Sequence, residues 1–320
     1  MQTEKPYLRH LTCSDDLKTT PPEIRAAFVQ QALEKGRRAI PYVQQARALK
    51  VAASKADTPR DLLSISKINA ALLTAAGVSG KSEGHIPHEA KDEAIQGLIE
   101  KYLVPAGDLF VEELVFRFLL IRGDTLGGVM RNYIGNLAQI KLTNAIIANL
   151  SNSGLDYHWS STREKRWNPS STYEDMAGET LISGIGWEDG DTHRTLLFNR
   201  QVPALEKKNV DAIFLNCEHN ESAETIRDYP KYIALGELKG GIDPAGADEH
   251  WKTAQSSLER IRDGFKKLDL KPQCFFVAAA IEIYMAHEIW AQLADDRLSN
   301  AANLTNSNQV ASLVDWLCDL

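Results

Sequence analysis

The sequence predicts an α/β protein in which a mixed sheet flanked by helices follows a largely helical first half. Three observations support this prediction. Helix-start signals and helical spacing of apolar residues recur through residues 20–120. Later in the chain, short apolar runs replace them at residues 195–198, 210–215, 232–239 and 273–280. The last two runs alternate with helical segments, which is typical of a sheet covered by helices.

Two segments of the first half begin with strong helix signals. Residues 20–23 (Thr-Pro-Pro-Glu) and 58–61 (Thr-Pro-Arg-Asp) each place a capping residue, a proline and an early acid at a helix start. We expect the first helix to continue to about residue 56 and Pro41 to break or kink it. The glycine-rich residues 123–128 are expected to form a turn that opens another helix. Its free N–H groups would suit a phosphate, although a plain turn explains the pattern equally well.

The second half is expected to form the sheet and the helices that cover it. Helices are predicted at residues 247–268, 284–293 and 309–317, and a polar linker at residues 300–308. We therefore expect a mainly helical region over residues 1–150 and a core with a C-terminal helix over residues 151–320.

Composition narrows the classes of function. The four cysteines lie far apart without a Cys-x-x-Cys pair, which argues against a structural zinc site or a disulfide framework. No run approaches the roughly 20 apolar residues of a membrane helix, and no secretory signal begins the chain. We expect a cytoplasmic protein without a membrane partner. The net charge of −7 by itself argues against nucleic-acid binding, but basic residues can gather on one face.

Two carboxylates and a lysine are expected to meet at one edge of the sheet. Glu237 and Lys239 lie two apart on a predicted strand, so both side chains project from the same side. Asp211 lies on the preceding strand. Carboxylates are hard oxygen ligands suited to Mg²⁺, and the carbonyl of Leu238 can add a third protein oxygen. Lys239 can orient an attacking water and offset charge on a phosphate, so this group indicates a Mg²⁺-dependent nuclease.

The pattern Asp…Glu-x-Lys is the arrangement of the restriction-endonuclease-like superfamily. A Glu-x-Lys triplet alone is common, and an exposed salt bridge usually explains it. Here the strand is otherwise apolar, an Asp-bearing apolar strand precedes it, and the order strand–strand–helix–strand–helix fits that core. From these residues alone, two alternatives stay open. One is a repair or structure-specific nuclease on the same core, and the other is a non-catalytic helical DNA-binding protein with an incidental triplet.

A longer segment carries a more specific resemblance. Residues 234–251, Ala-Leu-Gly-Glu-Leu-Lys-Gly-Gly-Ile-Asp-Pro-Ala-Gly-Ala-Asp-Glu-His-Trp, resemble the active-site segment of the BsoBI/AvaI family of type II restriction endonucleases. The chain length, the Lys-Asn-Val-Asp of residues 208–211 and the N-terminal residues 11–17 agree with that family. One departure from the wider superfamily is Val210, where a proline often precedes the aspartate, but this position provides no ligand.

The resemblance implies a restriction-endonuclease-like core with a large helical addition that wraps duplex DNA. It implies a homodimer that cuts both strands at the degenerate sequence C-Y-C-G-R-G and leaves 5′ overhangs with 5′-phosphates. A palindromic site asks for a two-fold symmetric protein, because each strand needs its own active site. A cognate DNA methyltransferase is expected in the same host.

The resemblance also suggests roles for single residues. His250 matches an active-site histidine of the family and would act as general base; the other interpretation is that it caps or packs its helix. Lys81 and Asp243 match residues that read bases, because lysine donates to guanine O6 and N7 and aspartate accepts from cytosine N4. Lys208, close before Asp211, is a candidate for base or backbone contact. Each of these three is as easily a surface residue.

Overall fold

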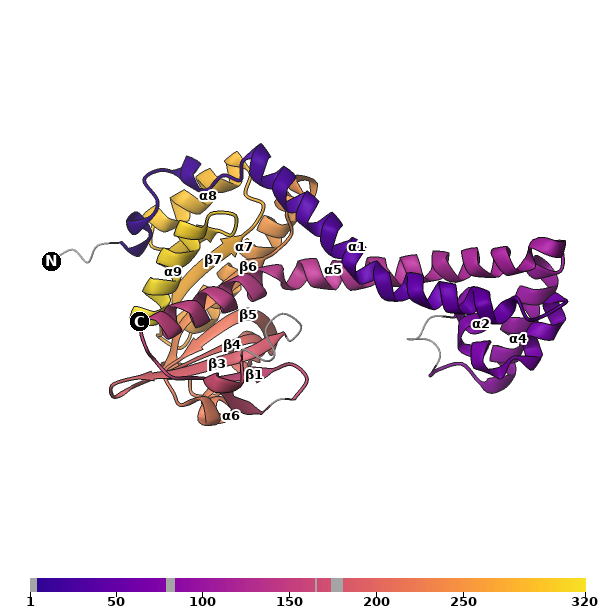
Figure 1. The fold of residues 1–320 in the computed structure, drawn as a ribbon. Helices are drawn as coiled ribbons and strands as arrows, with labels where there is room; N and C mark the ends of the chain where they lie inside the picture. Colours follow the sequence, from indigo (N-terminus) through magenta and orange to yellow (C-terminus); the bar gives the residue numbers. More distant parts are fainter. Residues whose placement is uncertain (1–4, 79–83, 165, 174–180) are drawn as a thin grey trace. The chain divides into compact units, whose positions relative to one another are not determined.

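The computed structural model describes residues 5–78, 84–164, 166–173 and 181–320 (Figure 1). By its internal contacts the chain divides into two compact units. One unit comprises Met1–Ala27 together with Ile134–Leu320, and the other comprises Phe28–Tyr133. No helix of the described residues is both long enough and apolar enough to cross a membrane.

The first unit is built on one mixed sheet with the strand order β2-β1-β3-β4-β5-β6-β7-β8 (Figure 1). Pairing is antiparallel from β2 to β6 and parallel from β6 to β8. The strands are β1 (Tyr157–Ser161), β2 (Trp167–Pro169), β3 (Ile182–Asp189), β4 (Thr192–Val202), β5 (Lys208–Leu215), β6 (Tyr232–Lys239), β7 (Gln273–Ala278) and β8 (Asn300–Asn303). This mixed sheet flanked by helices confirms the predicted α/β, restriction-endonuclease-like fold class.

Helices cover both faces of the sheet. The described residues of both units form the helices α1 (Pro21–Ala53), α2 (Asn69–Ala75), α4 (His88–Leu98), α5 (Phe110–Asn152), α6 (Ser222–Thr225), α7 (Ala247–Lys266), α8 (Ile283–Ala294) and α9 (Ser307–Asp319). One apolar core lies between the sheet and α7 and α8, and a second lies between the sheet, the end of α5 and α9. On α7, Trp251, Ala254 and Leu258 recur at three- and four-residue spacing, so one helical stripe faces the strands.

The second unit has its own core. Parts of α1 and α5 pack with α2 and α4 in this unit, and the buried side chains include Leu49, Leu72, Leu98 and Leu114. Pro41 lies inside α1 without ending it, so the predicted break is absent. Proline removes one helical hydrogen bond, and the flanking turns of α1 continue on both sides of it.

The predicted turn at residues 123–128 is wrong, because these residues lie inside α5. Each glycine in a helix costs about 1 kcal/mol relative to alanine. Burial of Phe118, Leu126 and Met130 on the same helix offsets that cost. The N–H groups of this segment belong to the interior of a helix, so the phosphate-binding turn is also absent.

The predicted polar linker at residues 300–308 is also wrong, because Asn300–Asn303 forms β8 and α9 begins at Ser307. The amide of Asn303 in this strand finds partners, whereas Nδ2 of the buried Asn300 has none among the described residues. The side chain of Asn303 donates to the carbonyl of Leu17 and to Oγ1 of Thr19, both at 2.9 Å. Sequence reasoning also missed β1, β2 and β3, which are short or contain glycine.

The two compact units do not divide the chain near residue 150, where the sequence placed the boundary. Leu11 and Leu17 lie in the core beside α8, so the N-terminal segment packs with the sheet unit. Beyond Ile134, Leu142 and Ile146 of α5 are buried against the sheet. Long-range packing of both segments therefore places them with residues that follow 150.

Candidate active site

The candidate site lies where β5 and β6 stop pairing. Their ladder ends at Ala212 and Gly236, so the next residues of each strand are not joined by strand pairing. Beyond that point a side chain takes over from the main-chain pairing: Oδ2 of Asp211 accepts a hydrogen bond from the main-chain N–H of Leu238 at 2.9 Å. A strand residue points its N–H and C=O toward the same neighbour. The carbonyl of Leu238 therefore faces the same side as Asp211.

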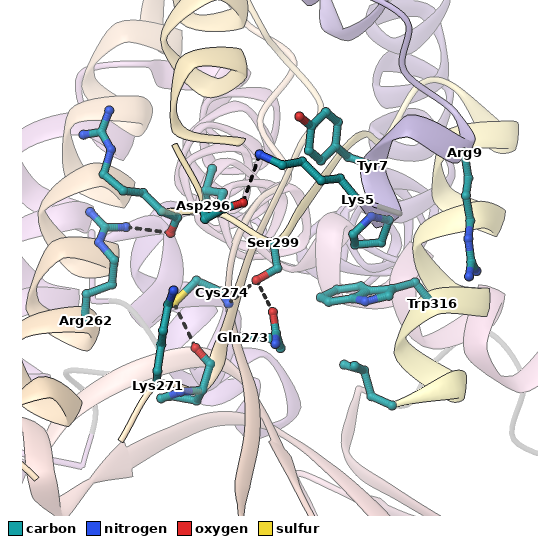
Figure 2. A pocket seen from close by; sticks show the side chains of 15 residues that line it. Lys5, Tyr7, Arg9, Arg262, Lys271, Gln273, Cys274, Asp296, Ser299 and Trp316 are labelled. Carbon is teal, nitrogen blue, oxygen red and sulfur yellow. Dashed lines mark hydrogen bonds and ion pairs between the residues drawn. The ribbon is translucent and has the colours of Figure 1, made fainter. Parts of the chain in front are cut away.

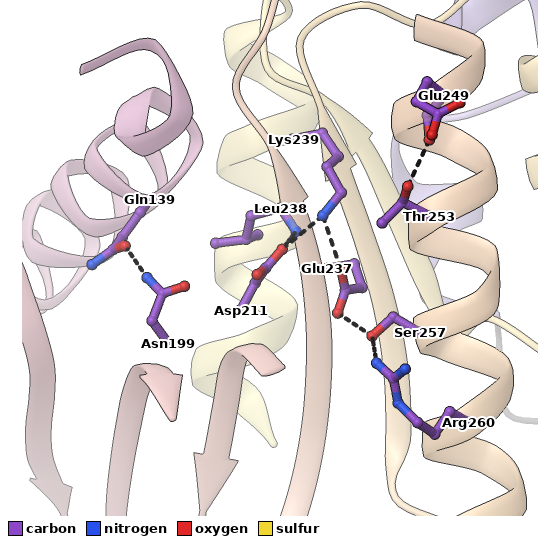
Figure 3. Close-up of polar contacts among 10 residues, drawn as sticks. All are labelled: Gln139, Asn199, Asp211, Glu237, Leu238, Lys239, Glu249, Thr253, Ser257 and Arg260. Atoms are coloured by element: carbon purple, nitrogen blue, oxygen red, sulfur yellow. Dashed lines mark hydrogen bonds and ion pairs between the residues drawn. The ribbon is translucent and has the colours of Figure 1, made fainter. Parts of the chain in front are cut away.

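Lys239 joins the two carboxylates (Figure 3). Its Nζ lies 3.0 Å from Oδ2 of Asp211 and 2.9 Å from Oε2 of Glu237. Glu237 is only 3% exposed. The structure thus brings together the two acids and the lysine that the sequence placed on neighbouring strands.

Burial and charge set the electrostatics of this group. Burial first, and then the neighbouring charge of Asp211, raise the pKa of Glu237 to about 7 against the opposing effects of Lys239 and Ser257. Burial disfavours the ammonium of Lys239, but the carboxylates of Glu237 and Asp211 outweigh it and raise the pKa of Lys239. Two carboxylates therefore share one cation, and a further cation beside Glu237 would favour its charged form.

Helix α7 supplies a hydroxyl to the same group. Oγ of Ser257 lies 2.6 Å from Oε1 of Glu237, and Nη2 of Arg260 lies 3.0 Å from Oγ of Ser257. Figure 3 shows Thr253, Ser257 and Arg260 along the side of α7 that faces β6. Sequence reasoning assigned neither Ser257 nor Arg260 to this site, and only the helical spacing of residues 249, 253 and 257 indicated a shared face.

On the other side of Asp211 lies an amide pair. The side chain of Asn199 on β4 donates to Oε1 of Gln139 on α5 at 2.7 Å, and Figure 3 shows Asn199 between Gln139 and Asp211. Asn199 has a φ of 51°, in the left-handed region that asparagine tolerates better than most residues. The pair ties the strand beside Asp211 to α5.

His250 packs beside the turn that follows β6. A Cβ built on Gly241 would lie 2.8 Å from Cε1 of His250, so the imidazole rests against this glycine, two residues after Lys239. The ring is half-buried in the first turn of α7. Among the described residues it has no hydrogen-bond partner, which leaves both ring nitrogens available.

Of the three residues expected to contact DNA, Asp243 and Lys208 lie apart from this cluster. Asp243 is exposed four residues after Lys239, and its Oδ1 accepts from the N–H of Ala245 at 3.0 Å, which caps a short turn. Lys208 is the exposed first residue of β5 and makes none of the cluster's contacts. Lys81 lies outside the described residues.

The donor set of the cluster fits Mg²⁺. Mg²⁺ in proteins typically binds one or two carboxylates and keeps several waters. Asp211 and Glu237 supply the carboxylates, and Oδ1 of Asp211 has no partner in the described part of the chain. Within the same residues, no group of three or more His, Cys, Asp or Glu side chains is placed to hold a metal ion.

A cavity of about 550 Å³ lies at the other end of the parallel strands (Figure 2). It is lined at the first residue of β7, Gln273, whereas Lys239 pairs with the last residue of β7, Ala278. Its lining is basic, but most of the cations have partners: Lys5 with Asp296, Arg9 with Asp319 and Arg297 with Asp295. The cavity is therefore separate from the carboxylate site.

A mixed sheet that carries an aspartate on one strand and Glu-x-Lys on the next defines the class of this protein. It is an enzyme of the restriction-endonuclease-like type.

Comparison with known proteins identifies the family. The family described as Restriction endonuclease BsobI matches residues 7–320, and the chain belongs to it. The type II restriction enzyme BsoBI of Geobacillus stearothermophilus is 50% identical over 327 residues, covering 100% of both chains. The type II restriction enzymes AvaI of Nostoc sp. and of Anabaena variabilis are each 50% identical over 316 residues, covering 98% of this chain and 100% of theirs. The predicted family and enzyme class are confirmed.

Proposed function

We propose that this chain is a Mg²⁺-dependent endonuclease that cuts both strands of duplex DNA at a degenerate palindrome. The observation that carries the proposal is the contact of one lysine, Lys239, with the carboxylates of Asp211 and Glu237 at 3.0 and 2.9 Å. The relatives named type II restriction enzymes support the same conclusion.

Asp211, Glu237 and the carbonyl of Leu238 would hold the ion. When bound, Mg²⁺ polarises the phosphoryl oxygen and makes water a better nucleophile. Burial of Glu237 keeps competing water away from its carboxylate, and the hydrogen bond from Leu238 keeps Asp211 turned toward β6.

Lys239 and His250 would act on the attacking water and on the phosphate. The ammonium of Lys239 orients the water and stabilises the charge that builds on the phosphate. The oxygen of the water forms a bond to phosphorus, the bond from phosphorus to O3′ breaks, and O3′ takes up a proton from solvent water. An unprotonated ring nitrogen of His250 accepts the proton that the water loses. The products are a 5′-phosphate and a 3′-hydroxyl.

The resemblance to the BsoBI/AvaI family supplies the finer expectations. The recognised sequence is C-Y-C-G-R-G, cut to leave 5′ overhangs by a homodimer in the cytoplasm, with a cognate methyltransferase protecting the host. The helical unit Phe28–Tyr133 would contribute the region that wraps the DNA. Lys81 and Asp243 would read bases, and Lys208 would contact base or backbone. The exposure of Asp243 and Lys208 is compatible with these roles.

The test is cleavage of a plasmid of known sequence with Mg²⁺, with the fragment ends sequenced. Wild type is expected to cut at C-Y-C-G-R-G sites and Asp211→Ala to lose cleavage. Asp248→Ala is the matched control, because Asp248 is an acid on α7 that pairs with Lys252 at 2.5 Å and makes no contact with Asp211, Glu237 or Lys239 among the described residues. Random nicking that Asp211→Ala abolishes would keep the nuclease and reject the specificity. Full activity of Asp211→Ala would reject the site.

His250 has a separate test. Loss of a general base lowers the rate of the chemical step by about 10²- to 10⁴-fold. His250→Ala should therefore slow single-turnover cleavage by that order while DNA affinity stays the same. A variant that cuts at the wild-type rate would show that the ring only packs against Gly241.

A further inference from the structure

Two side chains of α7 reach the carboxylate oxygen of Glu237 that Lys239 does not contact. Lys239 binds Oε2, whereas Oγ of Ser257 lies 2.6 Å from Oε1. Arg260, three residues further along α7, contacts the same hydroxyl at 3.0 Å (Figure 3). Both oxygens of Glu237 are therefore held, one from its own strand and one from the helix.

The direction of these hydrogen bonds follows from the chemistry of the groups. A guanidinium can only donate, so Oγ of Ser257 accepts from Arg260. The single hydroxyl hydrogen of Ser257 then remains for Oε1 of Glu237, which accepts it. The relay Arg260–Ser257–Glu237 has no second arrangement of its protons while Glu237 is charged.

The hydroxyl of Ser257 departs from the usual behaviour of its neighbours. Serine and threonine within a helix commonly donate to the carbonyl four residues earlier. Thr253 does so to Glu249 at 2.8 Å, and Ser256 to Lys252 at 3.0 Å. Ser257, which is buried, donates across to β6 instead. Its hydroxyl therefore acts on Glu237 and not on the backbone of α7.

We propose that Ser257 is a positioning residue for the candidate metal ligand Glu237, and that Arg260 positions Ser257. This inference rests on the proposed function, in which Glu237 holds Mg²⁺. A glutamate side chain rotates about three bonds, and a fixed hydrogen bond to one oxygen holds the carboxylate in one orientation. Groups that hold metal ligands in this way commonly contribute 10- to 100-fold to metal affinity or activity.

Removal of the hydroxyl is the direct test. In Ser257→Ala, the Mg²⁺ concentration for half-maximal single-turnover cleavage should rise about tenfold or more. Mn²⁺ binding to the DNA-free protein can be measured from the electron paramagnetic resonance signal of free Mn²⁺. The affinity for Mn²⁺ should weaken by the same factor. Ser257→Thr keeps the hydroxyl and should restore both values. Ser256→Ala is the control, because that hydroxyl binds only the backbone of α7.

Arg260 is tested through its dependence on Ser257. Arg260→Met removes the donor that directs the hydroxyl and should weaken metal binding less than Ser257→Ala does. If Arg260 acts through Ser257, the double variant should match Ser257→Ala alone, since the two effects are not additive within one relay. A double variant whose effects simply add would overturn the role of Arg260.

The outcomes separate this inference from the proposed function. If Glu237→Ala cuts DNA as wild type does, the proposed site itself fails. If Glu237→Ala loses cleavage but Ser257→Ala keeps the metal dependence of wild type, only the positioning role fails. A lower unfolding midpoint of Ser257→Ala with unchanged Mn²⁺ binding would likewise reduce Ser257 to a packing residue and overturn the inference.

Discussion

Replacement of Gly240 by alanine tests the packing of α5 against the end of the candidate catalytic strand. Gly240 directly follows Lys239, and a Cβ there would lie 2.5 Å from the carbonyl oxygen of Ile134 and 2.8 Å from the nitrogen of Ala138. Both are backbone atoms of α5, so no side-chain rotation can relieve the clash. Overpacking of this kind costs about 1–3 kcal/mol in the free energy of unfolding.

Gly135 provides a matched control on the same helix. It is exposed within α5, and nothing lies within 4 Å of the place where its Cβ would be. Gly135→Ala should therefore stabilise the protein by about 0.8–1 kcal/mol, the ordinary helix preference of alanine over glycine. The two variants should differ by about 2–4 kcal/mol in the free energy of unfolding.

Urea unfolding followed by circular dichroism measures this difference, and DNA cleavage measures its effect on the site. Displacement of the chain at Gly240 also shifts Lys239, and a shift of 1 Å can cost about 100-fold in rate. We therefore expect Gly240→Ala to lose cleavage under conditions in which it is still folded. If Gly240→Ala is as stable as Gly135→Ala, α5 does not approach this turn as closely as the structure shows.

Three further predictions concern pH, packing and metal. Burial lowers the pKa of His10, so as the pH falls below 6.5 the unfolded protein binds a proton at His10 before the folded protein does. The free energy of unfolding of wild type should therefore fall more than that of His10→Gln in this pH range. Equal losses in the two proteins would contradict this prediction. Asn303→Ala should lower the free energy of unfolding by about 1–3 kcal/mol, because it removes the hydrogen bonds to Leu17 and Thr19. It should also speed proteolysis of the segment that precedes α1, whereas the exposed control Asn308→Ala should do neither. EDTA should stop cleavage, and Mg²⁺ should raise the unfolding midpoint; a midpoint insensitive to Mg²⁺ argues against a carboxylate site.

The elements around the site were predictable because their patterns are local. The apolar residues of 232–239 and the helical spacing of 247–268 anticipated β6 and α7 nearly to their ends. The polar strand β8 was not predictable in this way, since Asn303 is stabilised by Leu17 and Thr19, nearly three hundred residues earlier in the chain. Hydrophobic periodicity indicates which side chains are buried, and it does not indicate a hydrogen-bond partner that is distant in the sequence.

By itself, the sequence determined that Glu237 and Lys239 share one side of a strand, because side chains alternate along an extended chain. It also determined the family, through a continuous segment of residues. Only the tertiary structure decided that β5 and β6 part at Gly236, so that Asp211 turns to Leu238 and Lys239. It alone decided that Ser257 meets Glu237. These contacts depend on how strands and helices pack, and the free energy of that packing is shared among residues far apart in the chain.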